Sequence, residues 1–261
     1  AINTINSFIN SFINFISLFS TTSASKIAIY IFSKPRKGGI DAEEKEFLET
    51  ADKKVVFYND IGIQTYQWIG NKPTVLLIHG WESNSYRWKD LIELLKSEDY
   101  NIISIDAPAH GNSGSKMFNA ILYSECINVV INQFNIHTVI GHSVGGTAIA
   151  IALHNYNISS VKKLISLGAP SNFIALSKTY RKMMGFNKRV KKAMDSYYLQ
   201  EFGHLPEYFT VANYSKNILA KGLIIHDRKD RIIPYKDAIE IARHYKKSEK
   251  VYQHILDFLN D

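Results

Sequence analysis

The sequence predicts one α/β domain, a mostly parallel sheet with helices on both faces plus a helical cap insertion. Three observations support this. The chain has 261 residues, of which 46% are hydrophobic, enough for one large core. Short apolar runs alternate with stretches of helical periodicity, as in parallel α/β folds. Each apolar run ends in turn residues, as buried parallel strands do.

The expected elements follow in chain order. Residues 1–51 form an N-terminal amphipathic helix and a linker, with a short helix over Asp41–Ala51. The core, 52–170 and 220–261, begins with two antiparallel strands and continues with five parallel ones: Val55–Tyr58, Ile63–Trp68, Val75–His79, Ile102–Asp106, Thr138–His142, Lys163–Leu167 and Gly222–His226. Four helices lie between or after them: Tyr86–Lys96, Asn119–Phe134, Gly145–Asn155 and Tyr235–Lys247.

Residues 171–219 interrupt this rhythm, because they are rich in Lys, Tyr and Met and have no strand pattern. We expect them to form a helical cap over the carboxyl edge of the sheet, where such sheets bind ligands. Eight basic and three acidic residues fall in this segment. Either a solvated helical face or an anion-friendly surface, for a substrate or a membrane, would explain this excess.

Charge and cysteine content bear on nucleic acid, metals and cofactors as partners. The formal net charge is +7, but most lysines outside the cap are scattered, so we expect no nucleic-acid partner. The single cysteine, Cys126, cannot form an intramolecular disulfide, and no Cys/His spacing resembles a zinc site. The sequence therefore predicts no cofactor and no metal.

The first twenty residues carry no charge and place apolar side chains at helical spacing: Ile5, Phe8, Ile9, Phe12, Ile16 and Phe19. The Asn and Ser residues between them form a polar face. This segment lacks the length of a membrane span and the basic start of a signal peptide, so we expect a cytoplasmic protein. The helix either packs against the domain or makes weak contact with a membrane surface, although such helices usually have a basic flank.

The motif that carries chemistry is Gly141-His142-Ser143-Val144-Gly145, which matches G-x-S-x-G. It lies between an expected strand and an expected helix, the context in which a sharp turn exposes a serine hydroxyl. Ser143 would also stand at a helix N-terminus, whose free N–H groups favour developing negative charge. The alternative is an ordinary glycine-rich turn.

With this motif the sequence resembles the α/β-hydrolase family over about Val55 to Asp261, in a serine esterase or lipase-like form with a short helical cap. The resemblance implies that Ser143 is the nucleophile. His79-Gly80-Trp81 matches the family's oxyanion turn, so the backbone N–H groups of Trp81 and Val144 would hold the oxyanion. The residues that follow this turn, Glu82 and Ser83, would face the substrate pocket.

Two further segments match the family. The stretch from Asp106 to Gly114 resembles the turn D-x-P-G-x-G-x-S, with Ala109 in place of the usual glycine, and implies turn roles for Asp106 and His110. The segment from Ile225 to Pro234 resembles the loop with the catalytic acid. That places the acid at Asp230, with Asp227 as the second choice.

A serine nucleophile implies acyl transfer to water through an acyl-enzyme, whereas related dehalogenases and epoxide hydrolases carry an aspartate there. We therefore expect a serine hydrolase, a carboxylesterase whose substrate is a small or medium acyl ester. Two alternatives stay open. The chain could be a non-catalytic binding protein on the same fold, because a fold does not prove activity. It could also use the serine for acyl transfer or C–C bond cleavage.

The pattern breaks at the histidine, which in the family follows one more strand after the acid. Here the expected helix runs through Ser248 and Glu249 almost directly into an amphipathic final helix, with neither strand nor histidine loop. Three explanations compete. The sequence omits a mobile segment between about Glu249 and Lys250, or the segment is truly absent and the protein only binds, or His254 or another histidine substitutes from an unusual position. His244, like His254, falls in helical periodicity that favours a packing or surface role.

Overall fold

The computed structural model describes residues 2–245 and 247–249. Its helices are α1 (Ile2–Phe19), α2 (Thr21–Ser33), α3 (Ala42–Leu48), α4 (Lys89–Ser97), α5 (Ala120–Gln133), α6 (Val144–Tyr156), α7 (Phe173–Met183), α8 (Lys188–Phe202), α9 (Val211–Ser215) and α10 (Lys236–His244), with 3-10 turns η1 (Ser85–Trp88) and η2 (Pro206–Tyr208). Its strands are β1 (Asp52–Tyr58), β2 (Ile61–Trp68), β3 (Lys72–Ile78), β4 (Tyr100–Ile105), β5 (Ile136–His142), β6 (Lys163–Leu167), β7 (Lys221–Ile225) and β8 (Ser248–Glu249).

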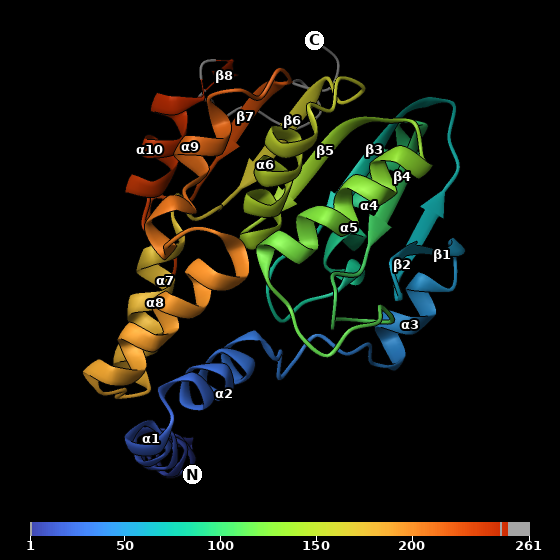
Figure 1. Cartoon of the computed structure of the whole chain (residues 1–261). Helices are drawn as coiled ribbons and strands as arrows, with labels where there is room; N and C mark the ends of the chain where they lie inside the picture. The colour runs from blue at the N-terminus through green and yellow to red at the C-terminus, as the bar shows by residue number, and fades with distance from the viewer. Residues whose placement is uncertain (1, 246, 250–261) are drawn as a thin grey trace.

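The strands form one sheet in the order β1-β2-β4-β3-β5-β6-β7-β8. In the described part of the chain β2 is antiparallel to both of its neighbours, and the other pairings are parallel. The sheet is twisted, and helices lie on both of its faces (Figure 1). The predicted fold class is therefore confirmed, as is the antiparallel pairing of the first two strands.

The core forms on the two faces of this sheet because successive strand residues point to opposite sides. In β3, Leu76 and Ile78 pack into the cluster under α5, α6 and α10, whereas Val75 and Leu77 pack into the cluster under α3 and α4. All four side chains are fully buried. A strand with apolar residues at every position thus belongs in the middle of a sheet covered on both faces.

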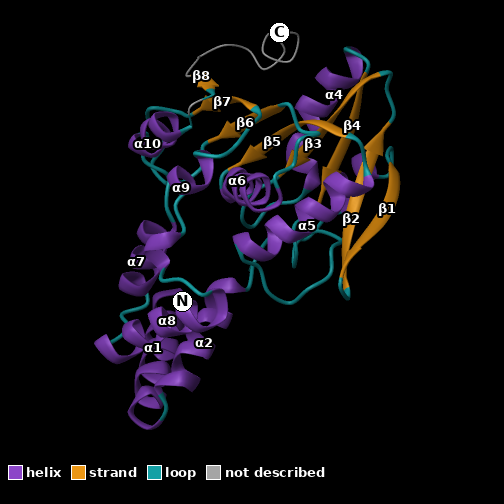
Figure 2. Ribbon diagram, turned by 45° about the horizontal axis from the view of Figure 1, so that its top comes forward, coloured by secondary structure: helices purple, strands orange, loops and turns teal. Residues whose placement is uncertain are grey.

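Residues 171–219, predicted as a cap, leave the sheet after the carboxyl end of β6 and return at β7. In the structure they form α7, α8, η2 and α9. Together with α1 and α2, the helices α7 and α8 make a bundle that projects from the sheet (Figures 1 and 2). We call α1, α2, α7 and α8 the helical arm.

The arm has its own apolar core, separate from those of the sheet. Its buried members come from all of these helices and from the loop between α7 and α8: Ile13, Ala24, Ala28, Ile29, Tyr180, Met184, Phe186, Val190, Met194 and Tyr198. The hydroxyl of Tyr180 also donates to the Ala28 carbonyl at 2.9 Å. The N-terminal helices α1 and α2 thus complete the bundle begun by α7 and α8. The helical periodicity of α1 did not predict that α2, residues 21–33, packs there too. Among the described helices, none is long and apolar enough to cross a membrane, and the cytoplasmic location stays a prediction.

The end of the described chain corrects one expectation. The predicted helix Tyr235–Lys247 ends earlier, at His244, and Ser248–Glu249 pairs with β7 as a parallel strand. Tyr245 explains the change, because its ring lies against Gly222, where a Cβ atom would meet ring carbons at 2.3 Å. Its hydroxyl donates to the Ala220 carbonyl at 2.8 Å, which fixes the chain beside β7. Ser248 and Glu249 are therefore strand at a place where sequence analysis expected none.

Candidate active site

Ser143 lies at the junction of β5 and α6 with φ 53° and ψ −128°. Positive φ is uncommon for a residue with a side chain, and it costs on the order of 1–3 kcal/mol. The backbone on both sides of this residue is closely packed. A Cβ atom on Gly141 would lie 2.7 Å from the Gly146 nitrogen, and one on Gly145 would lie 2.5 Å from the His79 carbonyl oxygen. Both glycines of the motif are thus required for the strand and helix to approach each other.

The turn after β3 lies directly against Ser143. A Cβ atom on Gly80 would be 3.0 Å from the Cβ of Ser143. Trp81 comes next in the chain, and its indole packs at 5.3 Å from the ring of Phe118. Val144 begins α6, so its backbone N–H is one of those that have no partner within the helix. The structure thus brings the predicted nucleophile close to the turn that carries the predicted oxyanion donors.

Two histidines fasten this turn to the loop after β4. His79 accepts the Ala107 N–H at Nε2 and donates from Nδ1 to the Gly80 carbonyl. His110 accepts the Glu82 N–H at Nε2, 3.0 Å away, and its Nδ1 lies 2.9 Å from the Pro108 carbonyl. Each arrangement requires a neutral ring with its proton on Nδ1.

Electrostatics agree with this tautomer. Burial, reinforced by the neighbouring His110, lowers the pKa of His79 to about 3. Burial also lowers the pKa of His110, against the raising effect of its hydrogen bond to Pro108. Both rings are therefore neutral near pH 7. The predicted turn role of His110 thus takes a definite form, a hydrogen bond that holds the backbone of Glu82.

Asp106 is held by the surrounding backbone. Its Oδ1 accepts the Ser85 N–H, and its Oδ2 accepts the Tyr66 hydroxyl and the Asn112 N–H, each at 2.9 Å. A Cβ atom on Gly111, where φ is +51°, would lie 2.1 Å from this carboxylate. A carboxylate with so many structural partners has no room for a substrate, which agrees with a role in the turn.

Asp230 stands on the loop between β7 and α10. Its Oδ1 accepts the Ile232 and Ile233 N–H groups at 2.7 and 2.9 Å, and its Oδ2 would lie 3.8 Å from a Cβ atom on Gly168. Gly168 follows Leu167, whose carbonyl accepts the Ser143 N–H at 2.8 Å. The second oxygen of Asp230 is thus directed toward the strand end that holds Ser143.

The charge of Asp230 is favoured by these contacts. Burial is the largest single influence and would raise the pKa of Asp230, but the Ile233 and Ile232 N–H donors, together with His226 and His142, outweigh it, so the pKa is lower than usual. His226 supports the loop: its Nε2 donates to the Ile233 carbonyl at 2.8 Å and lies 3.7 Å from Oδ2 of Asp230. The runner-up, Asp227, instead accepts the Lys229 N–H within an exposed turn.

The ring of His142, next to the predicted nucleophile, is hydrogen-bonded to an arginine. Its Nε2 lies 2.9 Å from NH2 of Arg87, the donor of this pair. Burial, followed by the Arg87 charge, lowers the pKa of His142 to about 4, although Asp230 acts in the opposite direction. A neutral ring engaged by an arginine does not serve as the base for Ser143.

Within residues 2–245 and 247–249, no histidine ring makes a hydrogen bond with Ser143. His244 lies on α10, where its Nδ1 donates to the Glu240 carbonyl at 2.8 Å, as a helix residue with a local role would. His254 and the predicted gap next to Lys250 lie outside the described residues. The described residues therefore bring Ser143 close to the turn after β3, with Asp230 on a neighbouring loop. The roles of these residues as nucleophile, oxyanion turn and acid stay predictions, as does the base.

The linker between α2 and α3 crosses the oxyanion turn, a contact that sequence analysis missed. The Arg36 N–H donates to the Glu82 carboxylate at 2.9 Å, and a Cβ atom on Gly38 would lie 2.9 Å from the Ser83 carbonyl oxygen. Glu82 and Ser83, predicted to face a substrate pocket, thus contact the linker.

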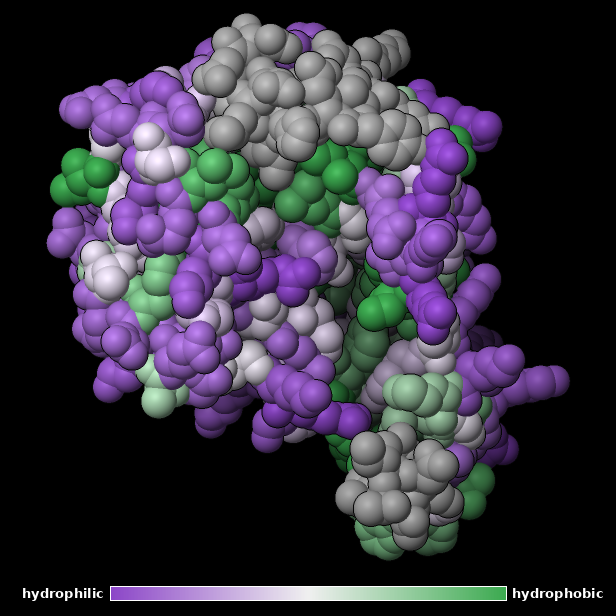
Figure 3. Space-filling view, turned by 180° about the vertical axis from the view of Figure 1, so that it is seen from behind, coloured by the Kyte–Doolittle hydropathy of each residue, from purple (hydrophilic) through white to green (hydrophobic). Residues whose placement is uncertain are grey.

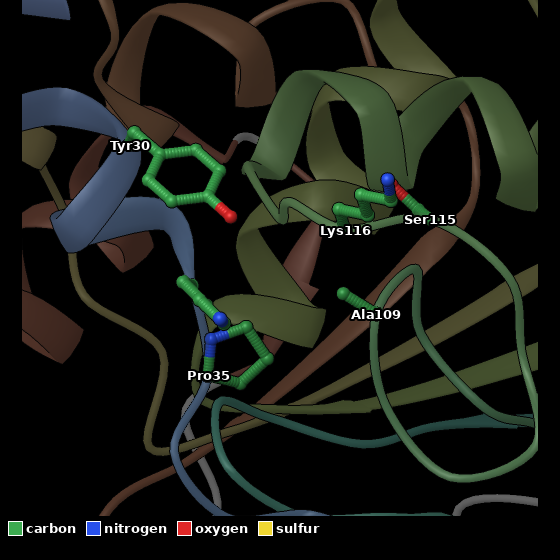
Figure 4. Close-up of a pocket in the computed structure, with 6 residues that line it drawn as sticks. Tyr30, Pro35, Ala109, Ser115 and Lys116 are labelled. Carbon is green, nitrogen blue, oxygen red and sulfur yellow. The ribbon is translucent and has the colours of Figure 1, made fainter. Parts of the chain in front are cut away.

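The linker also forms one side of a cavity of about 380 Å³, which neither Glu82 nor Ser83 lines. Its lining comes from α2, the linker and the loop after β4: Tyr30, Lys34, Pro35, Ala109, Ser115 and Lys116. Tyr30 and Lys116 face this space from opposite sides (Figure 4). The sequence gave no signal for this cavity, because its lining residues from 30–35 and from 109–116 meet only in the folded structure.

Comparison with known proteins agrees with this geometry. Residues 73–189 match the sequence model of the alpha/beta hydrolase fold. The chain is 23% identical to the AB hydrolase superfamily protein YisY of Bacillus subtilis (strain 168), over 78% of this chain and 89% of that protein. It is 33% identical over 102 residues to a serine hydrolase-like protein of Danio rerio, which covers 36% of this chain and 31% of that relative. Among solved structures, the Pyrococcus furiosus esterase PF2001 superposes with a TM-score of 0.61 at 19% identity, covering 83% of this chain and 86% of that one.

Proposed function

Because this chain is an α/β hydrolase by its fold and by the match of residues 73–189, we propose that it is a serine hydrolase, specifically a carboxylesterase acting on small or medium acyl esters. The observation that carries the proposal is the backbone of Ser143, which stands at φ 53° between two glycines that the close packing requires. A strained turn of this kind exposes a nucleophilic hydroxyl at the helix N-terminus.

The proposed reaction follows from these positions. The Ser143 hydroxyl attacks the ester carbonyl, and the N–H groups of Val144 and Trp81 stabilise the tetrahedral oxyanion. The alcohol leaves, and water then hydrolyses the acyl-enzyme. Asp230 orients a histidine that takes the serine proton and returns it to the leaving alkoxide. That histidine is proposed to lie outside the described residues, either as His254 or in a segment next to Lys250.

The test is ester turnover together with labelling of the serine. We expect the purified protein to hydrolyse p-nitrophenyl butyrate and to gain one fluorophosphonate adduct by mass. The variant S143A should lose both signals, with a fall in kcat of roughly 10³-fold or more. In parallel, H254A separates the two proposed sources of the base: loss of turnover assigns His254, and retention points to another histidine.

A second function is favoured by one observation. His142 is paired with Arg87, and no described histidine contacts Ser143. A chain without a base would bind ligands and not turn them over, as a binding protein on this fold. Folded protein that shows neither turnover nor an adduct would overturn the hydrolase proposal in favour of this one. If adduct forms without ester turnover, acyl transfer to another acceptor or C–C cleavage is the chemistry to screen.

A further inference from the structure

We infer that the helical arm is a docking surface for an anionic lipid membrane, a role that goes beyond the proposed hydrolysis and does not depend on it. The first observation is the orientation of α1. Its polar residues face the protein: Asn14 accepts the Asn187 N–H at 2.9 Å, and Ser17 accepts from the Asn187 side chain at 3.0 Å. A Cβ atom on Gly185 would lie 2.7 Å from Asn10.

The apolar side chains opposite these contacts face outward. Phe8, Phe12, Phe15, Leu18 and Phe19 are 50–79% exposed. They recur at helical spacing and share one side of α1, while Ile13 on the other side is fully buried in the arm. An uncharged helix with its aromatic face outward has the form of a segment that lies in a membrane interface. Such a contiguous apolar patch on a folded protein marks an interaction site.

Charge decides which partner fits. The arm, over 2–33 and 173–202, carries eight basic residues and only two acidic ones, so it holds +6 of the chain's net charge of +7. One of these acids, Asp195, already pairs with Arg181 at 2.5 Å. A second copy of this chain would bring the same positive arm against the first, whereas an anionic bilayer complements it.

Exposed basic residues flank the loop that packs on the polar side of α1. The loop that contacts Asn10 and Asn14 joins the end of α7 to the start of α8, where Lys182, Lys188 and Arg189 are exposed. Met183, 59% exposed, adds apolar surface at the same end. Figure 3 shows the arm projecting beyond the core, with apolar and hydrophilic surface side by side near its tip. The basic flank that the α1 sequence lacks is thus supplied by α7 and α8.

The arm also connects the membrane surface to the candidate active site. At the end of α2 the Ser33 carbonyl accepts the Phe118 N–H at 2.7 Å, and in the linker that follows the Gly38 carbonyl accepts the Gly111 N–H at 2.7 Å. Docking through the arm would therefore fix the orientation of the oxyanion turn relative to the bilayer. Apolar contact would supply affinity, and the lysines and arginines would select anionic headgroups.

The experiment measures sedimentation of the full chain with vesicles of pure phosphatidylcholine and of phosphatidylcholine mixed with phosphatidylglycerol. We expect binding to the mixed vesicles that weakens as salt is raised. The double variant F15Q/F19Q should reduce partitioning by roughly tenfold or more, because it removes two aromatic rings that would be buried in the bilayer on docking. The charge variant K182Q/K188Q/R189Q should lose its preference for the mixed vesicles, by roughly fivefold per charge removed.

A matched control is available on the core. F57Q/I69Q replaces two apolar residues that are 63% and 78% exposed, as Phe15 and Phe19 are 59% and 79% exposed, so it should bind vesicles like the wild type. Circular dichroism of each variant verifies folding. Absence of vesicle binding at low salt, or equal binding by F15Q/F19Q, overturns the inference. A concentration-dependent dimer that F15Q/F19Q abolishes, without vesicle binding, would instead show that a second copy covers α1.

Discussion

Nε2 of His110 accepts the backbone N–H of Glu82 at 3.0 Å, which joins the turn after β3 to the loop after β4. Trp81, whose N–H is a proposed oxyanion donor, immediately precedes the bonded residue. The His110 ring also lies 5.4 Å from the Trp81 indole. The side chain of His110, distant from Ser143 in the sequence, thus helps to orient the backbone at Trp81 and Glu82, on which the proposed oxyanion stabilisation depends.

We predict that H110A lowers kcat for p-nitrophenyl butyrate by roughly tenfold with little change in KM, because a misplaced donor weakens the transition state more than substrate binding. H110Q offers an acceptor at a similar distance and should recover most of the loss. Steady-state kinetics of the three proteins checks this. A general loss of stability without the split between kcat and KM would show that His110 only packs the loop.

Gly145 is predicted to tolerate no side chain. Its added Cβ atom would lie 2.5 Å from the His79 carbonyl oxygen and 2.6 Å from that of Ile78, both of which are backbone atoms that cannot move aside. G145A should therefore push α6 away from β3, destabilise the fold by roughly 1–3 kcal/mol and abolish serine labelling. Urea unfolding and fluorophosphonate labelling measure the two effects.

Gly39 provides the control for this prediction, because no atom lies within 4 Å of its added Cβ. G39A should unfold at the wild-type urea concentration or slightly above it, since alanine restricts the unfolded chain. If G145A is as stable and as reactive as G39A, close approach of strand and helix is not what the motif glycine provides.

The sequence predicted the strands of this fold well because their apolar runs are local and end at turn residues. Ser143 was located by the same logic, since its glycines serve a strand-to-helix turn that is itself local. The contact of Arg36 with Glu82 could not be predicted, because it depends on where the linker between α2 and α3 packs against the core. Ala109 has a φ of 63°, which explains why the family usually has glycine there, and its N–H donates to the Gly114 carbonyl at 2.8 Å.

The end of α10 was mispredicted for a related reason. Helical periodicity continues through Tyr245 and Lys247, but the Tyr245 ring fills a space that exists only because Gly222 has no side chain. A glycine in a distant strand therefore decides where the helix ends. Periodicity within one segment contains no information about that contact, so the strand Ser248–Glu249 was not predicted.

Acid should destabilise this protein through histidines that are neutral in the fold. The pKa values of His79 and His142 are lowered to about 3 and 4, mainly by burial, whereas an unfolded histidine titrates near about 6.5. As pH falls through about 6.5, the unfolded state binds protons that the folded state does not, so stability is lost toward pH 4. Each such histidine contributes a slope of about 1.4 kcal/mol per pH unit within that window.

The acid prediction is tested by urea unfolding between pH 7 and pH 5 for the wild type and H142Q. Glutamine can accept from Arg87 but does not titrate. The free energy of unfolding of the variant should therefore fall less steeply with decreasing pH, by the uptake of about one proton. The comparison also cancels carboxylates such as Asp106, whose pKa is raised by burial and whose effect has the opposite sign. Identical slopes for the two proteins would mean that His142 does not contribute.

A pair of variants, D230N and D227N, tests which of the two aspartates is the catalytic acid. In D230N the asparagine oxygen can still accept the Ile232 and Ile233 N–H groups, so the loop should keep its shape while the charge is lost. We expect kcat to fall by roughly 10³- to 10⁴-fold, because an amide neither orients the required histidine tautomer nor stabilises its imidazolium. D227N changes an exposed turn and should stay within about twofold of wild type. The reverse order of effects would move the acid to Asp227, and equal small effects would mean that neither carboxylate supports a base for Ser143.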